Sequence, residues 1–359
     1  MSSRARAVGR LLVYGLGVAV FFEAGARAAL SIDAFRERIH GHDDASKRLR
    51  WIASRKGKNE VGYSFDVHHP TRGWALRPGI RDMTVFGDRV LNSNSRGLRG
   101  RTEYAYDKAP GVRRVLVFGD SFTFGEDVSD DETYAHFLQQ RLPGVEVLNF
   151  GVHGYGHDQM LLYLQEEGLR YQPDVVVLGF LYDDMDRNLL GFRDYAKPRF
   201  ELRAGRLELR NVPVPSPQDT LGREAFRSKF VDLWTILRGR WDWRSGVAEQ
   251  RMKELTLAIL DEMARITRAA GAQPAYAYLP VWGELSKADM AMTRRERFFF
   301  NYCRERGIQS MYLRRFFLSN LRAGAKFQVY GHWGPEEHRT AAEGIAAYLL
   351  EKGLLAIAP

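Results

Sequence analysis

The sequence predicts an α/β protein, a three-layer α/β/α sandwich with a five-stranded parallel, flavodoxin-like sheet. From residue 111 onward, short apolar runs alternate with segments of helical periodicity, which is typical of a parallel sheet covered by helices on both faces. The chain has 359 residues, 45% hydrophobic and 27% charged, which suits one large domain with additions and does not require two. The candidate strands are the apolar runs at 115–119, 145–150, 174–181, 274–279 and 308–313.

Helical periods fill the spaces between these runs. An apolar face recurs in the segments that follow the first and second strands, on Tyr134, Phe137, Leu138 and Leu142 and then on Met160, Leu161 and Leu164. Three later helices are predicted over about 249–270, over about 291–306, and from Pro335 to Lys352. The single cysteine, Cys303, lies in the second of these and is predicted to be a core residue.

The net charge of +9 comes from arginines scattered along the chain. No dense basic stretch with interleaved aromatic residues is present in the sequence, so we expect no nucleic-acid partner. The charge is interpreted as surface solvation, which also suits contact with an anionic membrane or polysaccharide.

The first 30 residues are predicted to be a targeting segment. Arginines precede an apolar run of 12 residues, 11–22, which as a helix spans about 18 Å of a hydrocarbon layer about 30 Å thick. Extended to Leu30, the segment is long enough to cross but includes Glu23 and Arg27. We predict a single-pass anchor in the cell membrane, with the rest of the chain exported to the periplasm or the outside. A cleaved signal peptide and an amphipathic helix of a cytoplasmic protein are the alternatives.

The chain is divided into three parts on this basis. Residues 1–32 form the anchor, residues 33–110 an extension with short β elements, and residues 111–359 the main α/β domain. An insertion over 185–248 interrupts the alternation with a predicted hairpin, a proline-rich loop and a tryptophan-rich helix. This insertion is interpreted as a lid over the strand ends or as a membrane-facing patch, with packing against the core as the alternative.

The stretch from Val115 to Gly125 carries the first candidate for chemistry. It predicts a buried strand that runs into Gly-Asp-Ser and a glycine-bearing turn, so Ser121 stands where a parallel strand ends. Open α/β sheets bind ligands outside the carboxyl ends of their strands, which places this serine for chemistry. The structural alternative is a serine that caps the following helix.

Three other loops carry residues suited to acyl transfer, which needs a nucleophile, an oriented base and donors for an oxyanion. Gly151 follows the second strand and has an N–H group unobstructed by a side chain. Asp183 and Asp184 follow the third strand, and His332 lies in the loop before the last helix. Four loops that converge on one crevice are a more specific signal than any single motif.

Four sequence blocks resemble those of the SGNH/GDSL hydrolases: GDSF at 119–122, NFGVHGYG after the second strand, the third block at 179–188, and HWGPEEH near the C-terminus. The closest resemblance is to the bacterial, membrane-anchored branch, which often shows a segment like NSRGLRG upstream of the GDSF block. The resemblance implies Ser121 as the nucleophile and His332 as the general base, with the backbone N–H groups of Ser121 and Gly151 as oxyanion donors.

Two positions depart from the pattern of that superfamily. Asp183 stands where an asparagine supplies the third oxyanion donor, and an ionised carboxylate about 4 Å from an oxyanion would repel it by about 4 kcal/mol. A protonated Asp183 would donate instead, and burial beside Asp184 would raise its pKa in that direction. Tyr330 stands two positions before the base, where the branch usually has an acidic residue, and a phenol cannot balance an imidazolium charge.

Hypotheses from different classes follow from these residues. The first is a serine hydrolase of ester bonds, an O-acyl or acetyl esterase or an acyltransferase, that acts on an acylated small molecule, polysaccharide or lipid of the envelope and needs no cofactor. The second is a degenerate member of the fold that binds acylated glycans or an envelope partner without turnover. A third is a metal-dependent hydrolase built on Asp120, Asp183, Asp184 and His332, for which no recognised ligand spacing is present.

Overall fold

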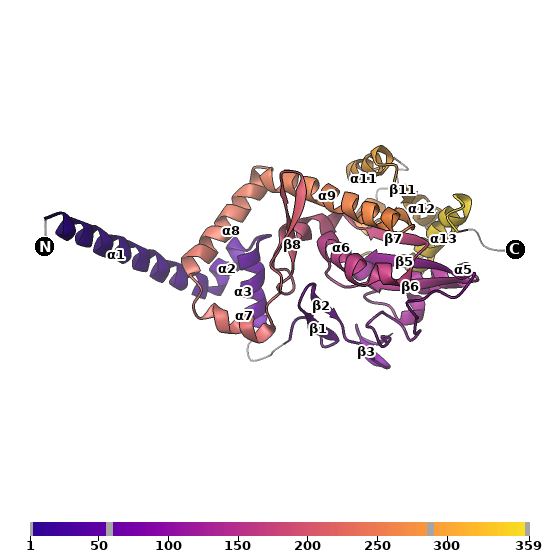
Figure 1. Ribbon diagram of the computed structural model, residues 1–359, viewed down its shortest axis with the longest axis horizontal. Helices are drawn as coiled ribbons and strands as arrows, with labels where there is room; N and C mark the ends of the chain where they lie inside the picture. Colours follow the sequence, from indigo (N-terminus) through magenta and orange to yellow (C-terminus); the bar gives the residue numbers. More distant parts are fainter. Residues whose placement is uncertain (1–2, 55–59, 286–290, 356–359) are drawn as a thin grey trace.

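A five-stranded parallel sheet forms the centre of the computed structural model, which describes residues 3–54, 60–285 and 291–355 (Figure 1). Its order is β11-β10-β7-β5-β6, and every neighbouring pair is parallel. Numbered along the chain within the sheet, this is the 2-1-3-4-5 order of flavodoxin-like folds, so the predicted sheet is confirmed. The strands are β5 (Arg113–Gly119), β6 (Val145–Gly151), β7 (Val175–Phe180), β10 (Gln273–Tyr278) and β11 (Gln309–Tyr312).

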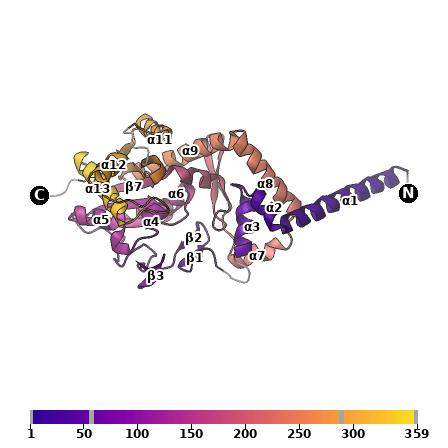
Figure 2. The same ribbon diagram turned by 180° about the vertical axis from the view of Figure 1, so that it is seen from behind.

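Helices cover both faces of the sheet and complete the predicted three layers. One face packs against α6 (His157–Glu166), α9 (Val247–Ala269) and α11 (Arg294–Glu305). The other packs against α5 (Tyr134–Arg141), α12 (Arg314–Arg322) and α13 (Pro335–Glu351). Figure 2 shows α5 and α13 at the end of the molecule that lies farthest from the N-terminal helix.

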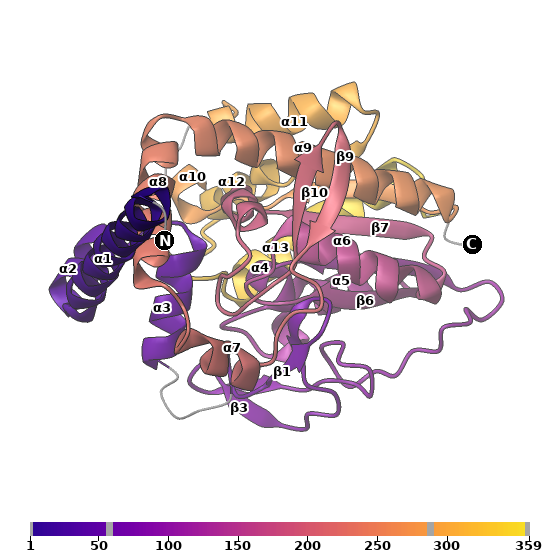
Figure 3. The same ribbon diagram turned by 60° about the vertical axis from the view of Figure 1, so that its left-hand side comes forward.

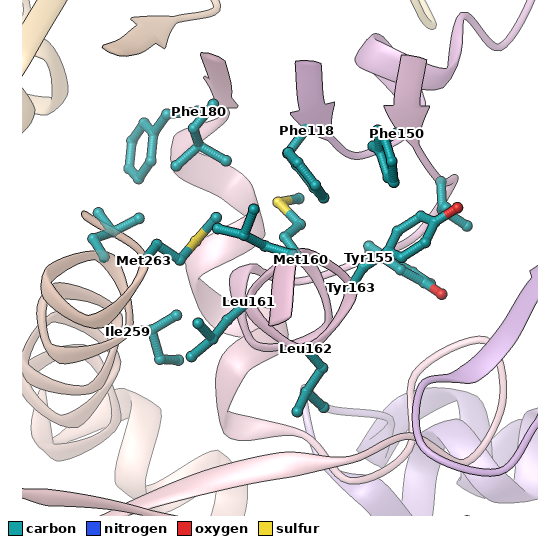
Figure 4. Packing of buried hydrophobic residues seen from close by; sticks show 14 of the residues in the cluster. Phe118, Phe150, Tyr155, Met160, Leu161, Leu162, Tyr163, Phe180, Ile259 and Met263 are labelled. Atoms are coloured by element: carbon teal, nitrogen blue, oxygen red, sulfur yellow. The ribbon is translucent and has the colours of Figure 1, made fainter. Parts of the chain in front are cut away.

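The strands are buried on both sides because their sequences are continuously apolar rather than alternating. In β5, Leu116 and Phe118 face the layer of α6 and α9, whereas Val115 and Val117 face the layer of α5 and α13. Figure 4 shows Phe118 and aromatic residues of the neighbouring strands pointing at the apolar side chains of α6. Cys303 is a buried free thiol in this core, as predicted, and burial raises its pKa to about 12.

A helical unit lies beside the sheet. Of its five helices, the sequence predicted only the N-terminal helix and the tryptophan-rich helix of the insertion. Its members are α1 (Ser3–Ser31), α2 (Asp33–Ile39), α3 (Asp44–Ser54), α7 (Pro217–Glu224) and α8 (Lys229–Arg244). The tryptophan-rich helix of the insertion is α8, and it packs on α1 and α3. Arg48 of α3 fixes this contact, because its buried guanidinium donates to Asp232 at 2.5 Å and to Glu224 at 3.1 Å.

Short antiparallel hairpins make up the rest of the extension and the insertion. As expected, β1 (Asp66–His69) pairs with β2 (Gly73–Leu76), and β3 (Met83–Val85) pairs with β4 (Arg89–Leu91). The predicted hairpin of the insertion is β8 (Arg199–Arg203) with β9 (Arg206–Arg210), and it lies against α9 (Figure 3). The short helices are α4 (Ser121–Phe124), α10 (Trp282–Leu285) and the 3₁₀ helices η1 (Asp130–Glu132), η2 (Gly168–Tyr171) and η3 (Tyr182–Leu189).

The N-terminal helix α1 projects from this body (Figure 1). Its segment Ala7–Ser31 is long and apolar enough to cross a membrane by length and composition, with a mean hydropathy of 1.6. The end of α1 nevertheless contacts the folded unit. Glu23 accepts hydrogen bonds from Ser228 Oγ at 2.7 Å and from two backbone N–H groups at the start of α8, each at 3.0 Å.

Candidate active site

Ser121 lies at the carboxyl end of β5, where the strand order of the sheet reverses. Such a switch point opens a crevice in doubly wound sheets, because the two neighbouring connections leave in opposite directions. The helix-capping alternative for Ser121 is wrong, because the N-cap residue of α4 is Asp120. Its Oδ1 accepts a hydrogen bond from the Phe122 N–H at 3.0 Å. The hydroxyl of Ser121 is therefore available for other partners.

His332 lies directly against this serine. The imidazole Nε2 is 2.9 Å from Ser121 Oγ, although 211 positions separate the two residues along the chain. Trp333 holds the histidine loop in place, since its buried indole donates to the Pro280 carbonyl at 3.2 Å and its ring packs edge-on against Phe122. Pro335 then starts α13 immediately after this loop.

Acidic groups next to His332 come from the turn after α4. Asp127 Oδ2 lies 3.5 Å from the imidazole Nδ1, and Glu126 Oε2 lies 3.8 Å from Nε2. Asp127 has a positive φ of 72°, a conformation that aspartate and asparagine tolerate better than most residues. Tyr330, which the sequence pattern places in the position of the orienting residue, has a side chain that is 88% exposed. The group beside the second ring nitrogen is thus Asp127 rather than Tyr330.

A buried arginine ties the serine loop to the loop after β7. Arg187 Nη1 lies 2.7 Å from Asp184 Oδ1 and 3.3 Å from Asp120 Oδ2, and it donates to the Tyr155 carbonyl at 2.8 Å. Asp120 Oδ2 in turn accepts from Ser121 Oγ at 3.1 Å. Burial raises the pKa of Asp184 well above its usual value; the Arg187 guanidinium opposes this rise, and the Asp120 carboxylate adds to it.

The glycine block after β6 brings Gly154, rather than the expected Gly151, to the cavity of Ser121. The N–H group of Gly151 donates to Asn149 Oδ1 at 2.9 Å, so it is already engaged. A side chain at Gly151 would collide with the backbone of α4, which explains why this position is a glycine. Gly154, three residues later with a φ of 72°, lines the same cavity as Ser121. Its N–H group has no hydrogen-bond partner among the described residues.

Asp183 also lies elsewhere than the sequence pattern indicates. Its side chain is 55% exposed and forms an ion pair with Arg295 at 2.9 Å. It lines a separate cavity of about 720 Å³ together with Tyr182 and Trp243. The physical reason is the 3₁₀ turn of η3, which buries Asp184 and turns its neighbour Asp183 outward. Asp183 therefore does not donate a hydrogen bond to an oxyanion at Ser121 in this arrangement.

The cavity that contains Ser121 and His332 has a volume of about 460 Å³. Residues of the N-terminal extension close one side of it. The Tyr63 hydroxyl donates to Glu126 Oε1 at 2.8 Å, and the buried pair His153 and Asp66 meets at 2.7 Å between Nε2 and Oδ1. Burial lowers the pKa of His153, but the carboxylates of Asp66, Asp194 and Glu126 together raise that pKa above its usual value. The extension is thus part of the site.

The residues of the metal-dependent alternative do not gather at one point. Asp120 and Asp184 face Arg187, Asp183 faces another cavity, and His332 faces Ser121. Among the residues that the structure describes, no three histidine, cysteine, aspartate or glutamate side chains are grouped in a way that would hold a metal ion.

Sequence reasoning brought Ser121 and His332 to one crevice but missed Asp127, Gly154 and Arg187. A signal for Asp127 is present, because two acidic residues, Glu126 and Asp127, come three residues after the GDSF block, just past Gly125. Arg187 gives no comparable signal, because its role depends on two carboxylates that only the fold brings together.

Comparisons with known proteins give similarity in structure only. No protein-family model and no curated protein matches the chain. The solved structures that match include TesA (16% identity, TM-score 0.41), a member of the lipolytic G-D-S-L family from Veillonella parvula (13%, 0.38) and an acetylxylan esterase from Geobacillus stearothermophilus (14%, 0.39). The three matches cover 68%, 67% and 66% of this chain and 100%, 97% and 94% of the respective proteins.

At these identities and TM-scores, what the chain does has to be argued from its own residues.

The raised pKa of Asp184 predicts a pH-dependent effect of Asp184→Asn on stability. Because the folded pKa lies above the unfolded value of about 3.9, ionisation of Asp184 costs folding free energy as the pH rises above that value. Loss of the Arg187 contact lowers the stability of the variant at every pH, but its melting temperature relative to wild type should rise from pH 4 to pH 7. Asp183→Asn, at the exposed neighbour, is the control for removal of a carboxylate from the same turn. A variant less stable than wild type at pH 7 but not at pH 4 would contradict the prediction.

Proposed function

We propose that the chain is a serine-dependent hydrolase of ester bonds. The observation that carries this proposal is the 2.9 Å contact between Ser121 Oγ and His332 Nε2, with Asp127 next to the other ring nitrogen. This is the order of nucleophile, base and orienting group that serine acyl transfer requires. The catalytic site lies at a sheet switch point, where doubly wound folds bind their ligands.

In the proposed mechanism, the Ser121 hydroxyl first turns its proton from Asp120 Oδ2 to His332 Nε2. His332 then takes this proton as Ser121 Oγ attacks the ester carbonyl carbon. The carbonyl oxygen becomes an oxyanion, which the N–H groups of Ser121 and Gly154 stabilise. The intermediate then collapses, the bond to the alcohol breaks, and His332 returns the proton to the departing alkoxide oxygen. An acyl group remains on Ser121, and either water or an acceptor hydroxyl removes it, so hydrolase and acyltransferase activities share every earlier step.

Asp127 and Arg187 have supporting roles in this proposal. The Asp127 carboxylate would favour the tautomer with a proton on Nδ1 and stabilise the imidazolium. Arg187 is a positioning residue, since it holds the Asp120 carboxylate that caps α4 and accepts from the Ser121 hydroxyl.

Fluorophosphonate labelling tests the nucleophile. Wild-type protein should gain one covalent adduct by intact mass, whereas Ser121→Ala should gain none, because only an activated serine hydroxyl attacks the phosphorus. A folded wild-type protein that gains no adduct would contradict the esterase proposal and favour a binding protein for acylated glycans. Equal labelling of Ser121→Ala would assign the nucleophile to another residue.

The orienting group is tested by a pair of substitutions. Asp127→Asn keeps the size and tolerates the positive φ but removes the charge, so we expect the labelling rate to fall by about 10²-fold or more. Tyr330→Phe removes only an exposed hydroxyl and should label at the wild-type rate. The reverse pattern, with Tyr330→Phe slow and Asp127→Asn normal, would return the orienting role to Tyr330.

The proposal includes an uncleaved membrane anchor at α1. Cleavage around residues 24–29 would remove Glu23, which holds the start of α8 through three hydrogen bonds. The apolar surface also continues onto α8, because Phe22 packs against Phe230 with ring centroids 5.6 Å apart and Trp234 is 61% exposed on the same helix. We infer that the membrane covers this surface and that the esterase domain is exported.

Carbonate extraction and intact mass test the anchor together. The full-length chain should stay with the membrane pellet and keep residues 1–30. Substituting both Leu12 and Leu16 by glutamate should release it, because each charge within a membrane-spanning helix costs about 3 kcal/mol. A soluble wild-type chain that begins within residues 25–30 would instead show a cleaved signal peptide.

A further inference from the structure

One face of α3 lines the cavity of Ser121 with cationic side chains. The residues that α3 contributes are Lys47, Arg50, Trp51 and Ser54, with the spacing of a single helix face. α3 belongs to the N-terminal extension, outside the elements that carry the serine and the histidine. The extension therefore contributes a wall with its own chemistry to the catalytic cavity.

The other arginines of this cavity already have carboxylate partners. Arg187 faces Asp120 and Asp184, and Arg193 is paired with Asp194. These contacts neutralise the two side chains within the protein. Neither the Arg187 nor the Arg193 guanidinium therefore keeps much net positive charge to attract a ligand.

Lys47 and Arg50 lack such compensation. Among the described residues, the Lys47 ammonium has no hydrogen-bond or ion-pair partner, and Arg50 reaches only Glu37, at 3.9 Å across an exposed contact. Burial lowers the pKa of Lys47, and the nearby Arg193 and Arg50 charges lower it further, whereas the Asp186 and Asp194 carboxylates oppose these effects without pairing with Lys47. Asp186 itself is engaged with His42 at 2.9 Å. A half-buried cation without a partner is costly unless a ligand supplies the opposite charge.

We propose that the ester substrate carries a carboxylate or phosphate group, which Lys47 and Arg50 bind while Ser121 attacks the ester. This inference rests on the proposed esterase function and adds a substrate class to it. Two cations one helical turn apart suit an oxyanion group with several acceptor oxygens, and such charge-assisted hydrogen bonds are the stronger kind. Lys47 and Arg50 are thus specificity-determining residues, and the substrate is an acylated anion rather than a neutral ester.

Matched ester pairs test this proposal on the full-length protein. The first pair is 4-acetoxybenzoate and 4-acetoxybenzamide, in which the charge lies on the alcohol portion. The second pair is 4-nitrophenyl hydrogen glutarate and 4-nitrophenyl pentanoate, in which the charge lies on the acyl portion. In at least one pair, wild-type kcat/KM should favour the anion by about tenfold or more, and 0.5 M NaCl should reduce that ratio because salt screens the attraction.

Variants assign the preference to the two cations. Lys47→Gln combined with Arg50→Gln should bring the ratio of anionic to neutral ester close to one, with the neutral ester as the internal reference. Arg38→Gln removes an exposed cation on α2 that lies outside the cavity, and it should keep the wild-type ratio. A neutral fluorophosphonate shows whether Ser121 is still in a formed site in the double variant.

The outcomes separate this inference from the proposed function. Wild-type protein that labels at Ser121 but hydrolyses both members of each pair equally would overturn the anionic substrate and keep the esterase. A labelled double variant that retains the wild-type preference would remove the role of Lys47 and Arg50. Absence of labelling in the folded wild type would defeat the esterase proposal itself.

Discussion

The buried carboxylate of Asp120 is the group on which the candidate site depends. One of its oxygens caps α4 through the Phe122 N–H, and the other accepts from the Ser121 hydroxyl and faces Arg187. Capping by Asp120 leaves the serine free of a structural role at the end of β5. Arg187 extends the same contact to Asp184, so the loops after two neighbouring strands are fixed to each other. The strand order then decides where this joined pair of loops lies, at the switch point of the sheet.

The site is assembled from both ends of the chain and not from the α/β domain alone. His332, which contacts Ser121, lies just before the last helix. At the other end of the chain, Tyr63 and Asp66 link the N-terminal extension to the serine cavity through Glu126 and His153. Within the helical unit, α3 packs on α8, and α8 packs in turn on the end of α1. A membrane-embedded α1 would therefore hold the cationic wall of the cavity close to the membrane surface. In that case the proposed anchor would also position the cavity wall that selects the ester.

Much of the fold could be predicted from the sequence, because alternation of apolar runs and helical periods determines a parallel sheet. Ser121 could be predicted for the same reason, since it follows a strand whose carboxyl end lies at the crevice. His332 was indicated instead by the resemblance of its HWGPEEH block. Asp183 could not be placed by its position in a block, because a 3₁₀ turn decides which of two adjacent aspartates is buried. Gly151 was assigned without knowledge of the Asn149 side chain, which takes its N–H group. Asp127 depends on a turn with positive φ that no periodic pattern reveals.

The proposed roles of Ser121, Gly154 and Asp127 can be tested most directly by a crystal structure of the protein after reaction with a phosphonate ester inhibitor. We expect phosphorus bonded to Ser121 Oγ, its free oxygen within about 3 Å of the N–H groups of Ser121 and Gly154, and Asp127 beside His332. A phosphonyl group on another residue would contradict the assigned nucleophile. A free oxygen turned away from Gly154, or a His332 ring turned away from Asp127, would contradict the proposed roles of those two residues.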